Sequence, residues 1–421
     1  MVVDPFVNAA GPSELLVCSI GPQLPASYVS YELRMNLRNS ARAAIAAVFL
    51  TILPAHAQQA PQPQVTIDLK PLGAATDLFA DRGDSKYQQR GVINVFWLDN
   101  DHFAVAFSTS RRWSGTQKPE PLHIRLIVFD LQGKKLHSRD WDVGAEGPEA
   151  VMTVELTPGP DNSILVIHRS NSESKIPDGD FVQVLNSDTT LRQDFHVPAT
   201  SNWVPSILPE PGMVLQTYYA DKHSSLTWWS GNPLKPGVKL DLSPNQGQLL
   251  AGPPGVATWA DCTTSIFCTG VHVYRQEKPA LYYSLPEGEL EPLPRVFLSP
   301  TSLVIELRSE EKKQSDLVLT HADGTHTPLP VIPHGSQVVG VTGVSRDGQR
   351  FALTAAGEVG ICGMFDFWCN ERSHAIVIDV PTNRIVFQQG VSAAAGTSGL
   401  SPDGKHLAIF DRDKLSVYAL P

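Results

Sequence analysis

A short phrase, in which a tight turn leads into a strand, recurs along this chain and limits the folds open to it. Its clearest copies are residues 401–410 (SPDGKHLAIF) and residues 345–353 (SRDGQRFAL). Asp-Gly supplies the positive φ of a hairpin turn, and the alternating apolar residues after it are typical of a half-buried strand. The phrase returns roughly seven times at a period of about 40–55 residues, which indicates a propeller or another repeat array.

Each repeat is expected to form one blade, with strands A to D ordered from the inside outward. Candidate B strands occupy residues 100–108, 163–168, 212–219, 267–274, 302–307, 349–355 and 405–410. Candidate C strands occupy residues 123–129, 181–185, 225–229, 280–285, 316–320, 374–379 and 414–419. Gly, Asp or Asn follows most C strands, as at residues 286–288 of the fourth blade, and predicts a turn into strand D.

The last C strand reaches the end of the chain with no D strand after it. Residues 64–70 (QVTIDLK) form a strand pattern that no other blade claims. We expect this strand to pair with residues 415–420 and close the ring, because closure removes the exposed edges that promote aggregation. The sequence therefore predicts an all-β fold, a seven-bladed β-propeller closed by an N-terminal strand and formed by residues 64–421 as a single domain.

An export signal is predicted to begin at Met35 rather than at Met1. Arg38 and Arg42 provide a positive start, residues 43–53 are apolar, and Ala55-His56-Ala57 matches a cleavage site. The other interpretation is a real N-terminal tail followed by an ordinary core helix.

Export would divide the beginning of the chain into three parts. Residues 1–34 would be a mis-called extension, residues 35–57 a signal peptide and residues 58–63 a linker. The apolar run is too short to cross a bilayer comfortably. We therefore expect a periplasmic or secreted protein with no stable membrane span after cleavage.

The composition argues against nucleic acid as a partner. The net charge is -10, and no basic run is longer than the pair Arg111-Arg112. Phosphate recognition needs clustered lysine and arginine side chains. Hydrophobic residues make up 42% of the chain, which is enough for a large core and too much for general disorder.

The SPDGKHLA phrase resembles the repeats of TolB-like and WD-repeat-like bacterial propellers. The resemblance is strongest over residues 341–421. The Gly-His and Trp-Asp pairs of true WD repeats do not recur in register, so the resemblance implies the fold and little about partners.

Four cysteines follow the predicted signal peptide, as the pairs Cys262/Cys268 and Cys362/Cys369. Paired cysteines in an exported chain predict disulfides. The strand assignment places the first pair between strands A and B of blade four and the second between strands B and C of blade six. Those turns would lie on opposite faces, in blades that are not adjacent, which excludes cross-pairing and leaves two local bridges. The alternative is zinc, although neither pair has the C-x2-C spacing of a zinc knuckle.

No catalytic motif is found in the sequence. It contains no G-x-S-x-G elbow, Walker loop, H-E-x-x-H helix or Rossmann fingerprint. We accordingly predict no catalytic residue, no cofactor and no metal.

Long B–C loops give the best candidates for binding, because binding concentrates on loops that a rigid scaffold holds. The candidate residues come from blades one, three and six: Arg111, Arg112, Trp113, Tyr218, Tyr219, His223, Phe365, Phe367 and Trp368. For the last three, the alternative is a loop that caps its own blade. We expect a monomeric, non-catalytic binding module for an unknown protein or small-molecule ligand. The alternative function is a propeller-type hydrolase or lyase with polar residues at the central channel.

Overall fold

The computed structural model describes most of the chain that follows the predicted export segment. The described residues are 61–74, 94–109, 122–143, 151–170, 180–198, 200–219, 223–242, 249–262, 268–275, 280–284, 290–309, 314–332, 336–357, 372–392, 397–411 and 413–421. The predicted extension and signal peptide, residues 1–57, lie outside these ranges. Within them, no helix is both long and apolar enough to cross a membrane.

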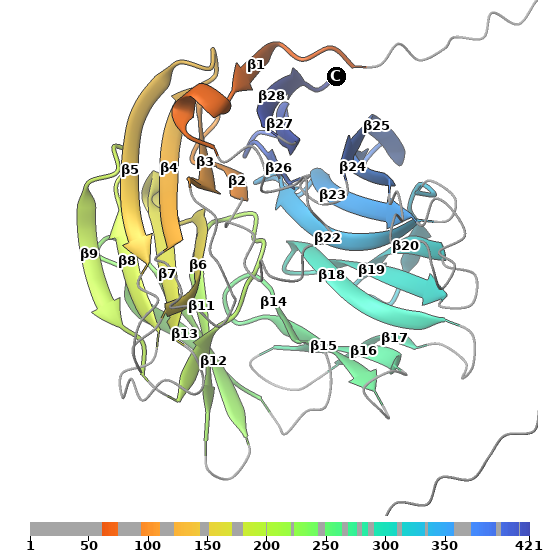
Figure 1. Ribbon diagram of the computed structural model, residues 1–421. Helices are drawn as coiled ribbons and strands as arrows, with labels where there is room; N and C mark the ends of the chain where they lie inside the picture. The colour runs from red at the N-terminus through yellow and green to blue at the C-terminus, as the bar shows by residue number, and fades with distance from the viewer. Residues whose placement is uncertain are drawn as a thin grey trace, which may run out of the picture. The chain divides into compact units, whose positions relative to one another are not determined.

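The strands pair into seven antiparallel sheets of four strands each, which follow one another around a common axis (Figure 1). Blade one consists of β2 (Asn94–Trp97), β3 (His102–Ser108), β4 (Leu122–Asp130) and β5 (Lys135–Val143). Blade two consists of β6 (Val151–Pro158), β7 (Ile164–Ser170), β8 (Phe181–Leu185) and β9 (Leu191–His196). Blade three consists of β10 (Ser201–Trp203), β11 (Met213–Tyr218), β12 (Ser224–Ser230) and β13 (Lys235–Leu242). Blade four consists of β14 (Leu249–Ala251), β15 (Ala257–Cys262), β16 (Cys268–Tyr274) and β17 (Ala280–Ser284). Blade five consists of β18 (Glu291–Ser299), β19 (Ser302–Ser309), β20 (Gln314–His321) and β21 (His326–Pro328). Blade six consists of β22 (Ser336–Val344), β23 (Arg350–Gly357), β24 (Arg372–Asp379) and β25 (Arg384–Ser392). Blade seven consists of β26 (Thr397–Leu400), β27 (His406–Asp411), β28 (Lys414–Ala419) and β1 (Val65–Asp68). Two short 3-10 helices, η1 (Lys70–Leu72) and η2 (Pro160–Asn162), complete the described elements.

Blade seven confirms the predicted closure of the ring. The N-terminal strand β1 lies beside the C-terminal strand β28, as Figure 1 shows near the end marked C. Val65 is the register partner of Val417, and Asp68 is the partner of Lys414. The fold is therefore an all-β, seven-bladed propeller whose last sheet joins the two ends of the domain.

Two strand assignments in blade four are wrong, each by one place in the sheet. Residues 267–274 were expected to be strand B, but β16 is the third strand of its sheet, and β17 (residues 280–284) is the fourth. Residues 286–288 therefore belong to the connection between blades four and five. The error arose because β14 has only three residues, too few to show alternation. Cys262 and Cys268 consequently flank a B–C connection rather than the expected A–B turn.

The core is a ring of apolar clusters, one between each pair of neighbouring blades. Successive residues of a strand point to opposite faces, so each inner strand contributes to two clusters. Phe103 packs toward blade seven, whereas Ala104 packs toward blade two. This explains why the B strands are apolar along nearly their whole length.

The recurrent Ser-x-Asp-Gly phrase forms the A–B turns of blades six and seven. The hydroxyl of Ser345 donates to Asp347 at 2.6 Å, and Ser401 donates to Asp403 at 2.7 Å. The next backbone N–H groups bond back to these side chains. Gly348 has a φ of 68°, as the sequence predicted.

Candidate functional site

A hollow of about 370 Å³ opens beside strand β11 of blade three, at the end of the propeller where the B–C connections lie. Its lining combines aromatic, amide, carboxylate and apolar side chains: Asp180, Asn202, Trp203, Val204, Pro205, Gln216, Tyr218 and Leu249. These residues come from blades two, three and four, so the hollow lies where the B–C ends of three blades meet.

The pairing of β10 with β11 places the polar groups of this hollow. Asn202 and Gln216 are register partners, and Tyr218 follows Gln216 on the same face of β11. The Tyr218 hydroxyl donates to Gln216 Oε1 at 3.0 Å, and Gln216 Nε2 donates to Ser224 Oγ at 3.2 Å. The Tyr218 side chain nevertheless remains 49% exposed. This edge presents an aromatic ring, the hydrogen-bonded amide of Gln216 and the amide of Asn202.

Tyr219 points to the other side of the strand and has a different environment. Its ring stacks on His223 at a centroid distance of 4.3 Å, and Lys239 Nζ lies 5.3 Å from the ring centroid. Its hydroxyl lies 3.1 Å from Ser225 Oγ. Hydrogen bonds with Ser225 and with Lys239 lower the pKa of the Tyr219 phenol. Tyr218, Tyr219 and His223 therefore lie together at one blade end, but only Tyr218 lines the hollow.

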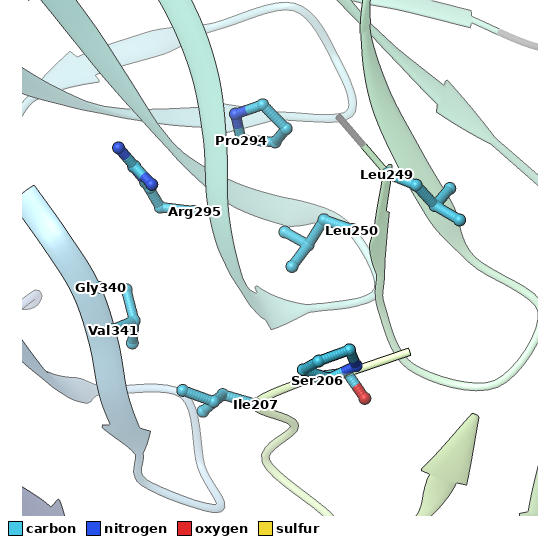
Figure 2. Close-up of a pocket in the computed structure, with 9 residues that line it drawn as sticks. Ser206, Ile207, Leu249, Leu250, Pro294, Arg295, Gly340 and Val341 are labelled. Atoms are coloured by element: carbon cyan, nitrogen blue, oxygen red, sulfur yellow. The ribbon is translucent and has the colours of Figure 1, made fainter. Parts of the chain in front are cut away.

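A second hollow, of about 260 Å³, adjoins the first and lies deeper between the inner strands (Figure 2). The two hollows share Pro205 and Leu249. The deeper one is mostly apolar, with a single charged side chain: Pro205, Ser206, Ile207, Leu249, Leu250, Pro294, Arg295, Gly340 and Val341 line it. In Figure 2, Leu250 points into the space between the strands, and Ile207 extends toward Val341.

The connection between β10 and β11, residues 204–212, crosses the channel between the inner strands. Ile207 packs against the cluster of blades five and six, although it belongs to blade three. Ser206, Ile207 and Val341 also line a third hollow, of about 220 Å³, whose other walls come from blades one, two and seven. Ser206 and Ile207 of this crossing segment therefore line both the deeper hollow and the third one.

Arg295 stands at a break in the pairing of β18 with β19. The register shifts between Pro294 and Val296, which makes Arg295 the extra residue of a β-bulge. Its guanidinium bonds to the fully buried carboxylate of Glu306, through Nε at 2.5 Å and through Nη2. Ser315 Oγ and the Val338 N–H also donate to Glu306, the latter at 3.1 Å. The bulge and this buried network fix the position of the one charged group in the deeper hollow.

Several predicted site residues lie outside the part of the chain that the structure describes. These are Arg111, Arg112, Trp113, Phe365, Phe367, Trp368, Cys362 and Cys369. For the other cysteine pair the backbone is described, and Cys262 and Cys268 are register partners across β15 and β16. Among the described residues, no group of three His, Cys, Asp or Glu side chains could hold a metal ion.

Sequence reasoning missed the polar residues inside the channel. Asn202 and Gln216 lie in ordinary strand patterns, and only their pairing brings them together. Arg295 and Glu306 lie in strands that also carry the charged residues Glu291 and Arg308, so the sequence does not mark them as a pair.

Comparisons with known proteins place the chain only at the level of the fold. No protein-family model matches it, and no curated protein matches it. Solved structures with similar folds include TolB from Acinetobacter baumannii, with 11% identity over 75% of this chain and 80% of that chain, at a TM-score of 0.37. The β-propeller domain of the trilobed protease from Pyrococcus furiosus is 6% identical over 78% of this chain and 95% of that chain, at a TM-score of 0.48. An oligogalacturonate lyase in complex with manganese is 9% identical over 79% of this chain and 96% of that chain, at a TM-score of 0.44. These similarities are too low to carry function.

Proposed function

We propose that this protein is an exported, non-catalytic binding module that takes a small molecule at the B–C end of its channel. The observation that carries the proposal is the hollow beside β11, where Tyr218, Gln216 and Asn202 meet. Ligand sites are usually concave and combine apolar or aromatic walls with a few fixed polar groups. The two adjoining hollows have this character, because an apolar channel leads away from a polar rim.

The expected chemistry is capture rather than turnover. A ligand can stack on the Tyr218 ring and exchange hydrogen bonds with the amides of Gln216 and Asn202. Neither amide titrates, so neither can act as a general acid or base. Asp180 lies at the rim and is buried, and it is the one carboxylate of this hollow. Export, with cleavage after Ala57, would place the site in the periplasm or outside the cell.

Equilibrium dialysis tests this proposal. The purified protein is dialysed against a small-molecule extract of the cells that produce it, and mass spectrometry identifies the compounds it retains. The wild type should retain a compound that the double variant Tyr218→Ala, Gln216→Ala does not. The control is Tyr219→Ala, which leaves the hollow intact and should retain that compound.

The state of the recovered compound separates the two function classes. A binding module returns it unchanged, whereas a hydrolase or lyase would return products. Products that form with the wild type and not with the double variant would overturn the non-catalytic assignment. Equal retention by all three proteins would show that the site is elsewhere.

A further inference from the structure

We propose that the deeper hollow binds a small carboxylate with a short apolar body, and that Arg295 is the residue that binds the carboxylate group. This inference rests on the proposed function and names the class of ligand. Three observations carry it: the fixed position of Arg295, its unused hydrogen-bond donors, and the apolar walls around it.

The Arg295 guanidinium is held in place before any ligand arrives. Nε and Nη2 bond to Glu306, and Nη2 also lies 3.3 Å from the Val338 carbonyl oxygen. The Arg295 side chain is 14% exposed, whereas Glu306 is fully buried. A side chain held in this way loses little conformational freedom when a ligand binds.

The remaining nitrogen of Arg295, Nη1, has donors left for a ligand. Arginine carries five N–H donors in a planar fork. Nη1 has no hydrogen-bond partner among the described residues, and Arg295 lines the deeper hollow. A hydrogen bond from a charged donor to a carboxylate is about twice as strong as one between neutral groups.

The walls around Arg295 favour an apolar body on the ligand. Ile207, Leu250, Pro294 and Val341 line the same hollow. At Gly340, an added Cβ would have no heavy atom within 4 Å, so this wall faces open space. The volume of about 260 Å³ is below the usual range of roughly 300–1,000 Å³ for ligand pockets. The ligand should therefore be small.

Other ligand classes fit this hollow less well. A neutral apolar molecule would cover the guanidinium without pairing its donors, which is costly. Inorganic phosphate would pair with the donors but would leave the apolar walls in contact with water. A carboxylate on a short hydrocarbon or aromatic body satisfies both parts of the hollow.

Calorimetric titration with defined probes tests the inference. Hexanoate and benzoate are titrated into the full chain, with hexanamide, benzamide and inorganic phosphate as matched controls. At least one carboxylate should bind, and it should bind tenfold or more tightly than its amide. A wild type that binds neither carboxylate overturns the inference.

Three variants locate the binding. Arg295→Gln should weaken carboxylate binding by roughly tenfold or more, because a charge-assisted bond is lost. Gly340→Leu should abolish binding by filling the hollow while leaving Arg295 in place. Gly390→Leu is the matched control: it lies on the outermost strand of the same blade, an added Cβ there also meets nothing within 4 Å, and binding should be unchanged.

The outcomes separate this inference from the proposed function. If hexanamide binds as tightly as hexanoate and Gly340→Leu abolishes both, the channel remains a ligand site and only the carboxylate assignment is wrong. If Gly340→Leu folds normally and leaves carboxylate binding unchanged, the hollow is not the site. If Arg295→Gln is unfolded, the Gly340→Leu and amide measurements still decide.

Discussion

Trp97 donates its indole N–H to the carbonyl oxygen of Gly399 at 2.8 Å, across the junction between the first blade and the last. The two residues are far apart in the sequence, and the Trp97 side chain is buried in the cluster that joins these blades. An added Cβ at Gly399 would lie 2.7 Å from the carbonyl oxygen of Val95, so the two backbones can approach only because this residue is glycine. The bond therefore reports directly on closure of the ring.

Replacing Trp97 with Phe should lower the free energy of unfolding by about 2–4 kcal/mol, since packing is reduced and a buried carbonyl loses its partner. Urea denaturation measures this. Trp141→Phe is the control, because Trp141 lies on an outer strand and its indole bonds to a side chain, Gln183, at 3.2 Å. Equal losses in the two variants would contradict a special role for the junction.

The glycine of the A–B turn in blade six should tolerate no side chain. Gly348 has a φ of 68°, and an added Cβ would collide with the Leu298 carbonyl oxygen of blade five. Gly348→Ala should cost more than about 2 kcal/mol, because backbone strain and a steric clash add. Thermal unfolding of Gly324→Ala provides the comparison: Gly324 has a φ of 85° but open space around it, so that variant should lose only about 1–2 kcal/mol. Similar melting temperatures for the two variants would exclude the clash.

Asp379 should make the free energy of unfolding depend on pH. Burial alone would raise the pKa of this carboxyl, but hydrogen bonds from Thr382 and Arg350 outweigh it and hold the pKa below its ordinary value. The pKa of an aspartate carboxyl in the unfolded chain is about 3.9. A carboxyl whose pKa is lower than this in the folded state stabilises the protein at pH values above about 3.9, and this contribution is lost as the pH falls through the pKa of the folded state.

Asp379→Asn should accordingly be less stable than the wild type near neutral pH, and the difference should shrink as the pH falls below about 3.9. Urea unfolding across that range measures it. Asp241→Asn, at a side chain that is 69% exposed, is the control and should change stability little at any pH. A difference for Asp379→Asn that stays constant with pH would rule out the linkage.

The register of blade four predicts a local bridge between Cys262 and Cys268. Register partners in an antiparallel pair have Cα atoms roughly 4.5–5.5 Å apart, within the range of about 4.4–6.8 Å that a disulfide requires. Peptide mapping without reduction should find the two cysteines linked to each other. In the sequence, Cys362 and Cys369 fall between strands β23 and β24, which is also a B–C connection, so the argument from opposite faces no longer excludes cross-pairing. A link between Cys262 and Cys362 or Cys369 would refute the local bridge.

Strong local patterns explain what the sequence predicted correctly about the fold. The B and C strands alternate and are bounded by turn residues, so β8 and β28 were predicted with their observed bounds. The closing strand β1 could be inferred because one strand was left over. Short inner strands gave no such pattern: β14 was missed, and blade four was assigned one strand out of step.

The candidate site was only partly predictable, because it depends on contacts between blades. Tyr218 was found, since an exposed aromatic residue at a strand end is visible in the sequence. Its partner residues Asn202 and Gln216 come together only through register. The position of Arg295 depends on a bulge, and no local pattern marks a bulge in advance.

The segment that crosses the channel, residues 204–212, has a consequence for how molecules could move through this protein. With Ile207 packed against the far wall, this segment lies between the hollow of Arg295 and the hollow beyond it. A molecule that enters or leaves the hollow of Arg295 from the B–C end would then pass the doorway beside Tyr218. A large molecule resting in that doorway would delay entry and exit by this route alike.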